Sequence, residues 1–127
     1  MARSTAQVVA GRKQSIVHAI RGLRLLVREE ANARVHVAAT LLAVLAGSTA
    51  HVSFAEWRWL ALACALVWSA EAFNTAIERV CDRLSRDHDP LIGAAKDVAA
   101  GAVLVAALAA GAIGASIFLP HLMGFFE

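Results

Sequence analysis

The chain has few charges, few cysteines and none of the common nucleotide-binding loops. Charged residues make up 17% of its 127 residues and apolar residues 59%, whereas soluble domains have about 25% and about 45–50%. The net charge of +2 is too small to indicate a nucleic-acid partner. The two cysteines form no CxxC pair, which argues against a disulfide framework or a metal site. No Walker A loop, kinase glycine-rich loop or HRD motif is present, so any nucleotide site has to be of another kind.

The apolar residues are concentrated in long runs, which points to a lipid solvent rather than a large soluble core. Ahead of these runs, residues 6–29 combine apolar side chains at helical spacing with surrounding arginines. This pattern is typical of an amphipathic helix on a membrane surface. A soluble helix packed on a core is the alternative, but the rest of the chain leaves no soluble core. We therefore predict an all-α integral membrane protein, with one membrane-embedded domain over residues 1–127.

Three runs are long enough to cross a ~30 Å hydrocarbon layer as helices. The first, residues 35–54, contains no Asp, Glu, Lys or Arg and leads into a turn at 53–56 with the S-x-x-E spacing of a capping box. The second, residues 57–84, starts with two tryptophans suited to a membrane interface and has to continue through polar residues. The third, residues 98–119, is rich in Ala and Gly, so we expect close packing against other helices and an end at Pro120.

The basic residues predict the topology. Most Lys and Arg lie before the first span or around the segment between the second and third, whereas only Arg58 is near the first interspan turn. By the positive-inside rule, the N-terminus faces the cytoplasm and the C-terminus faces outward. His36 and His51 lie near the two ends of the first span, where we expect polar side chains to reach water.

Four polar residues of the second span are the most informative. Glu71, Asn74, Glu78 and Asp82 are offset by 3, 7 and 11 positions, which places them within a stripe of ~80° on one helix face. An ionisable group near the bilayer centre costs at least ~2.5–3.5 kcal/mol, so it usually faces a partner or a wet cavity and serves a function. A hydrogen-bond cluster that only holds the bundle together is the alternative. It does not explain how acids on one face avoid repulsion without a cation or protons.

Two further groups lie at the same cytoplasmic boundary. Glu29 and Glu30 end the surface helix, and Lys96 and Asp97 open the third span. Alone, the first pair is a solvated acidic pair and the second a helix cap. Together with the polar stripe they offer carboxylates for a divalent cation and a lysine for phosphate, and magnesium typically takes one or two carboxylates plus substrate phosphates. We expect the carboxylates of Glu30, Glu78 and the more deeply placed glutamate of the stripe to converge near the inner surface.

At these residues the sequence resembles the small bacterial membrane kinases that comprise diacylglycerol kinase and undecaprenol kinase. The strings E-A-F-N-T-A-I-E at 71–78 and A-K-D at 95–97 carry the resemblance and are highly specific in a three-span protein. Upstream matches are Gly22-Leu23, E-A-N-A-R-V-H at 30–36 and Glu56-Trp57, and the resemblance covers about residues 12–115. It implies phosphorylation of a membrane lipid hydroxyl with ATP and Mg²⁺.

The resemblance also implies roles for individual residues. Glu71 resembles the general base of the family, and Asn74 and Lys96 resemble groups that position the lipid and the phosphates. Glu30 and Glu78 resemble its metal-binding carboxylates. The implied nucleotide contacts are His18, Asp87, His88, Asp89, Lys96 and Asp97. The sequence departs from the family at Asp89, where relatives commonly have His, and at Ile16 and His18, where they commonly have aromatics, which bears on adenine binding.

The family forms homotrimers whose sites are shared between neighbouring subunits, so the resemblance implies a homotrimer in the bacterial inner membrane with its active site at the cytoplasmic face. The implied substrate is undecaprenol or diacylglycerol. The N-x-R-x-H string after Glu30, Asp89-Pro90-Leu91 and residues 99–103 look closer to the undecaprenol kinase branch. The alternative function is a non-enzymatic membrane assembly protein or a small ion or proton pathway subunit. A pathway needs ionisable groups through the outer half of the bilayer, and residues 60–67 and 103–119 have none.

Overall fold

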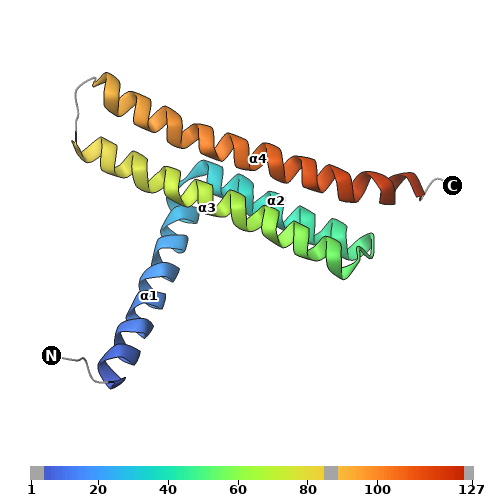
Figure 1. The fold of residues 1–127 in the computed structure, drawn as a ribbon, viewed down its shortest axis with the longest axis horizontal. Helices are drawn as coiled ribbons and strands as arrows, with labels where there is room; N and C mark the ends of the chain where they lie inside the picture. The colour runs from blue at the N-terminus through green and yellow to red at the C-terminus, as the bar shows by residue number, and fades with distance from the viewer. Residues whose placement is uncertain (1–4, 85–88, 125–127) are drawn as a thin grey trace.

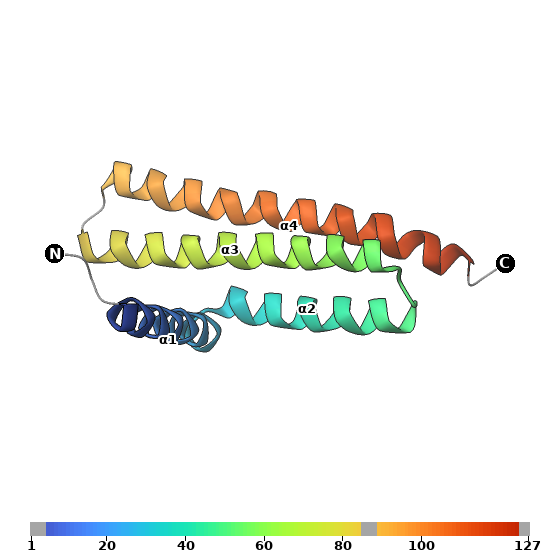
Figure 2. The ribbon, with the colours of Figure 1, turned by 60° about the horizontal axis from the view of Figure 1, so that its bottom comes forward.

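The computed structural model describes residues 5–84 and 89–124, and these residues form four helices without a strand. The helices are α1 (Thr5–Glu29), α2 (Ala31–Thr49), α3 (Phe54–Leu84) and α4 (Pro90–Gly124). Helices α2, α3 and α4 run alongside one another, with α3 in the middle, and α1 leaves them at a steep angle (Figures 1 and 2). Each of the three is long and apolar enough to cross a membrane. The prediction of an all-α chain with three such helices is confirmed.

Helix α2 ends at Thr49, so the prediction that the first span continues as helix to residue 54 is wrong. The chain leaves the helix through His51, whose φ of 51° is left-handed. The N–H of Val52 then donates to the carbonyl of Gly47 at 3.1 Å, which closes the last turn as in a Schellman motif. The apolar pattern continues across this turn because the residue after it is buried, and hydropathy alone therefore does not show the break.

Helix α3 begins at Phe54, and the predicted capping box precedes it. The backbone N–H of Ser53 donates to Glu56 Oε2 at 2.6 Å, and the Ser53 hydroxyl donates to the same oxygen at 2.7 Å. In return, the N–H of Glu56 donates to Ser53 Oγ at 3.3 Å. These bonds satisfy amide groups that the first turn of a helix otherwise leaves without partners.

Helix α4 is longer than the third predicted span at both ends. It begins at Pro90, where Asp89 Oδ1 accepts hydrogen bonds from the N–H groups of Leu91 at 2.8 Å and Ile92 at 3.4 Å. An aspartate N-cap followed by proline at the first helical position is a strong helix start. The helix continues through Pro120 to Gly124, so the expected stop at Pro120 is wrong. Only about one turn of helix follows the proline. The proline therefore disturbs few helical hydrogen bonds, and the helix can continue past it.

The apolar core lies at the end of the bundle where α2 turns into α3. Val52, Leu60 and Ile117 are buried there, with Trp57 and Phe118 packed against them. A Cβ atom on Gly47 would lie 2.8 Å from Cη2 of Trp57, so the absence of a side chain at Gly47 lets the Trp57 ring of α3 pack against α2. The glycines of α4 do not have that role within the chain, because a Cβ at Gly101, Gly111 or Gly114 would meet nothing within 4 Å.

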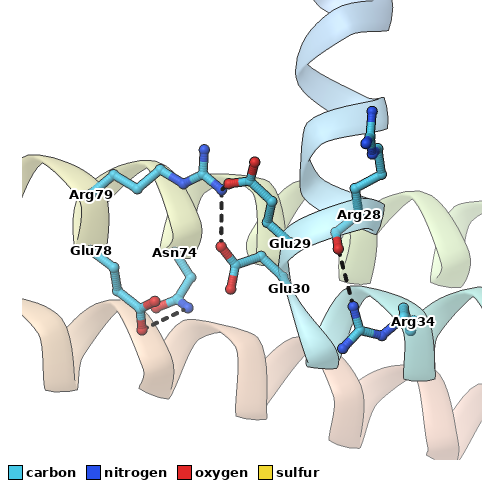
Figure 3. A network of polar contacts seen from close by, with 7 residues as sticks. All are labelled: Arg28, Glu29, Glu30, Arg34, Asn74, Glu78 and Arg79. Atoms are coloured by element: carbon cyan, nitrogen blue, oxygen red, sulfur yellow. Dashed lines mark hydrogen bonds and ion pairs between the residues drawn. The ribbon is translucent and has the colours of Figure 1, made fainter.

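A single non-helical residue joins α1 to α2. Glu30 has extended backbone angles (φ −97°, ψ 126°), while its N–H still donates to the carbonyl of Leu26 at 3.0 Å. Arg34 Nη1 donates to the carbonyl of Arg28 at 3.2 Å and satisfies one of the free carbonyls at the end of α1. The change of direction between the two helices therefore falls on Glu30, and places its side chain at the corner beside α3 (Figure 3).

Candidate active site

Glu71 is the most deeply buried polar residue among those that the structure describes. Its side chain is 2% exposed, and Asn74 and Thr75 beside it on α3 are also buried. Within the described part of the chain, Glu71 Oε2 and Asn74 Oδ1 have no hydrogen-bond partner. A buried polar atom without a partner loses its hydration and gains nothing in return, at a cost of about 1–3 kcal/mol. Such atoms mark a place where function rather than stability determines the residue.

His36 lies against Glu71 rather than at the water-facing end of α2 where we expected it. Its side chain is 15% exposed, and its Nε2 atom is 3.8 Å from Glu71 Oε2. The ring meets Trp68 edge to face, with 6.4 Å between ring centroids. Trp68 Nε1 donates to Thr40 Oγ1 at 3.1 Å, and Thr40 Oγ1 donates to the carbonyl of His36 at 2.7 Å. The apolar length of the first span gave no sign of this contact, because it depends on how α2 and α3 pack.

The polar stripe on α3 runs from the interior to the surface. Glu71 and Asn74 are buried, Glu78 is half-buried and Asp82 is exposed. Asn74 Nδ2 donates to Glu78 Oε1 at 3.2 Å, and Lys96 Nζ of α4 donates to Asp82 Oδ1 at 2.9 Å. The shared face predicted from the spacing is therefore present, and Lys96 lies beside its outermost member.

Arg79 is a contact that the sequence analysis missed. Its Nη2 atom pairs with Glu29 Oε2 at 3.0 Å and with Glu30 Oε1 at 3.1 Å, and thereby ties the α1–α2 corner to α3 (Figure 3). The only signal in the sequence is its place next to Glu78, at the end of the 71–78 string. Its partners are about fifty positions away, and no local pattern indicates them.

The expected convergence of three carboxylates is not found. Within residues 5–84 and 89–124, no group of three or more His, Cys, Asp and Glu side chains is placed to hold a metal ion. In this structure Glu30 is paired with Arg79, and Glu78 accepts a hydrogen bond from Asn74.

The predicted nucleotide contacts are spread over several elements. His18 is exposed on α1, and Asp97 is exposed on α4. Asp89 has a structural part, because its carboxylate caps α4. Asp87 and His88 lie outside the described residues.

An apolar groove of about 290 Å³ is lined at one end by His36, the neighbour of the buried glutamate. Its lining comes from α2, α3 and α4, and His36, Thr40 and Trp68 stand at one end and Phe118 at the other. Between them the wall of α4 consists of small residues, including Gly111 and Gly114. The groove is therefore open because these positions carry little or no side chain.

Taken together, these features define an integral membrane protein whose three spanning helices hold a polar site beside an apolar groove. The family described as prokaryotic diacylglycerol kinase matches residues 17–118, and the chain belongs to this family. It is 42% identical over 109 residues to the undecaprenol kinase of Bacillus subtilis (strain 168), covering 86% of this chain and 89% of that protein.

Two diacylglycerol kinases are also similar to the chain. The one from Synechocystis sp. is 35% identical over 118 residues, which cover 92% of this chain and 67% of that protein. The one from Escherichia coli (strain K12) is 37% identical over 90 residues, which cover 71% of this chain and 74% of that protein. These matches include the polar stripe of α3.

Proposed function

We propose that this protein is a lipid kinase that transfers the γ-phosphoryl group of ATP to the hydroxyl of a membrane lipid. The observation that carries the proposal is the buried, unpartnered carboxyl of Glu71, which begins a polar stripe that leads to the surface in a chain of this family. The relatives named above are kinases of undecaprenol and of diacylglycerol, so the acceptor we propose is one of these two lipid alcohols. The identity of 42% with the undecaprenol kinase favours the former.

In this mechanism Glu71 is the general base. It accepts the proton of the lipid hydroxyl while the hydroxyl oxygen forms a bond to the γ-phosphorus and the bond to the bridging oxygen of ADP breaks. Phosphoryl transfer depends mainly on positioning and on charge neutralisation. We propose that Asn74 and Lys96 position the lipid and the phosphates. In support, Asn74 donates to Glu78 on the same face, and Lys96 lies at the surface end of the stripe, where it pairs with Asp82.

Glu30 and Glu78 are the residues that we propose hold Mg²⁺. The donor set fits this ion, because carboxylates and the free amide oxygen Asn74 Oδ1 are hard oxygen ligands. Since no three-carboxylate cluster is preformed among the described residues, phosphate oxygens of ATP have to complete the coordination. When bound, the ion neutralises charge on the phosphates. Arg79 has to share Glu30 with it or release it, because Arg79 pairs with Glu30 in this structure.

His18, Asp87, His88, Asp89, Lys96 and Asp97 remain our proposed nucleotide contacts. They belong to α1, to the start of α4 and to the segment between α3 and α4. Asp89 also has a structural role, because its Oδ1 atom accepts the hydrogen bond that caps α4. The single-domain organisation over residues 1–127 and the surface placement of α1 are also proposals.

We propose a homotrimer with its site at the cytoplasmic face of the inner membrane. Large apolar side chains on α2 and α4 support the trimer, because Leu41, Leu45 and Leu108 are more than half exposed in the single chain and need lipid or another subunit to cover them. The cytoplasmic placement rests on the basic residues near the site end of the bundle. A C-terminal reporter that is active only in the cytoplasm should stay silent, and activity there would contradict this orientation.

The activity is tested with the purified protein, labelled ATP and either undecaprenol or diacylglycerol in mixed micelles. We expect one labelled lipid phosphate to form in the presence of Mg²⁺ and none in excess chelator. The Glu71→Gln variant, prepared in parallel, controls for contaminating kinases. If the folded protein phosphorylates neither alcohol, the proposal is wrong and a non-enzymatic membrane role is favoured instead.

A further inference from the structure

Two buried atoms, one on α2 and one on α3, face each other without a hydrogen-bond partner within the described residues. His36 Nε2 and Glu71 Oε2 are both inaccessible to solvent and without a hydrogen bond, and they are 3.8 Å apart. Each atom alone would keep the desolvation cost of a buried polar group that has no partner. A movement of less than 1 Å joins them, and hydrogen bonds at active sites are often long before substrate binds and tighten in the occupied site.

The His36 ring packs against a tryptophan, Trp68, that is itself anchored by a hydrogen bond. Trp68 meets it edge to face, and Trp68 Nε1 is itself anchored on the hydroxyl of Thr40. The same hydroxyl donates to the backbone carbonyl of His36 at 2.7 Å. The imidazole therefore contacts both the anchored Trp68 ring and the carboxyl of Glu71, as expected of a group that orients a catalytic side chain.

His36 is suited to donate a hydrogen bond to the carboxylate of Glu71. Glu30 and Glu78 are acids and cannot donate a hydrogen bond when ionised, whereas His36 Nε2 lies 3.8 Å from Glu71 Oε2 and can carry the proton that such a bond needs. We propose that His36, which lines the groove, is a positioning residue, whose Nε2–H donates to Glu71 Oε2 and fixes this carboxylate with its other oxygen free for the lipid hydroxyl. This inference rests on the proposed kinase function, in which Glu71 is the base.

The test compares His36→Leu, which removes the donor, with His36→Gln, whose amide retains a donor at a similar distance from the backbone. His121→Leu is the matched control, because His121 lies 3.8 Å from Glu56 at the other end of the bundle. With undecaprenol and ATP at saturation, we expect His36→Leu to lower kcat per folded protein by about tenfold while both KM values stay within about twofold. His36→Gln should recover most of the loss, and His121→Leu should leave kcat unchanged.

A positioning residue acts through its partner, so its effect has to disappear when the partner is changed. In a Glu71→Gln background, we expect His36→Leu to cause no further loss of kcat. An equal loss in both backgrounds, or an unchanged kcat in His36→Leu, would overturn the proposal. If the loss of activity in His36→Leu follows the amount of folded protein, and His36→Gln does not restore it, His36 has only a packing role.

A readout without activity separates this inference from the proposed function. The imidazole nitrogen resonances of His36 in ¹⁵N-labelled protein should shift when Glu71 is changed to Gln and stay in place when Glu56 is changed to Gln. If the His36 resonances do not shift in Glu71→Gln, the two side chains do not form a pair and the inference fails. If it responds to Glu71 but neither lipid alcohol is phosphorylated, the pair stands and the kinase proposal fails.

Discussion

Helix α3 carries two glutamates that are about four turns apart, each with a histidine nitrogen 3.8 Å away, and their surroundings are opposite. Glu56 is 28% exposed, and its carboxylate accepts two hydrogen bonds from Ser53. Its histidine, His121, is 2.8 Å from the carbonyl of Ile117 and so has another partner. Glu71 is 2% exposed, and neither its Oε2 atom nor the nitrogen facing it has a partner within the described residues.

The difference between the two acids distinguishes a structural role from a functional one. A carboxylate that satisfies the first turn of its own helix stabilises the fold and has nothing left to offer a ligand. A carboxylate that is buried with a free oxygen lowers stability and is retained for chemistry. Proximity of a histidine is the same in both places and therefore does not discriminate between them. The state of the remaining hydrogen bonds does.

Neutralising each acid in turn tests whether Glu71 and Glu56 have different roles. Glu71→Gln keeps the size of the side chain but accepts no proton, so we expect turnover to fall by about 10²-fold or more, the low end of a general-base contribution. The variant should fold, keep its oligomeric state and still bind ATP. Glu56→Gln is the matched control and should keep normal turnover per folded protein. The measurement is turnover at saturating ATP and lipid, normalised to folded oligomer.

Two results would contradict this view. Near-normal turnover in Glu71→Gln means that Glu71 is not the base. Turnover that falls only in proportion to the folded fraction in both variants means that the two acids have the same structural role.

The next largest effect is expected at the surface end of the stripe. Glu78→Gln removes one of the two carboxylates proposed to hold Mg²⁺, so we expect turnover to fall by about tenfold or more and the binding of Mg²⁺-ATP to weaken. Titration of activity with Mg²⁺ and of binding by calorimetry measures both. Glu29→Gln is the control, because Glu29 is more exposed and, among the described residues, pairs with Arg79 alone. Full activity of Glu78→Gln, or of the wild type in excess chelator, would exclude the metal proposal.

The smallest expected effect on catalysis concerns the apolar end of the bundle. Gly47→Ala places a methyl group 2.8 Å from the ring of Trp57, and such overpacking costs about 1–3 kcal/mol. We expect a lower melting temperature in detergent with unchanged turnover per folded protein. Gly101→Ala, where a Cβ meets nothing within 4 Å of the same chain, is the control. If Gly47→Ala lowers turnover without lowering stability, the two ends of the bundle are coupled, and the Glu56 end does not have a purely structural role.

Local sequence patterns predicted the features that depend on neighbours along the chain. The spacing of Glu71, Asn74 and Glu78 placed them on one face because a helix has a fixed period. The S-x-x-E string predicted the capping box for the same reason, since all of its hydrogen bonds lie within one turn. The break between α2 and α3 was misplaced because a left-handed residue such as His51 is uncommon without glycine and has no hydropathy signal.

The sequence by itself determined that this chain has three long apolar helices, a polar stripe on the second of them and the strings that identify its family. These properties follow from composition and from periodicity within single elements. Only the tertiary structure decided that His36 faces Glu71 and that Arg79 pairs with Glu30. The physical reason is that each of these contacts joins two helices, and their relative rotation is set by close packing, at Gly47 against Trp57 and at the corner on Glu30, rather than by any pattern along the chain.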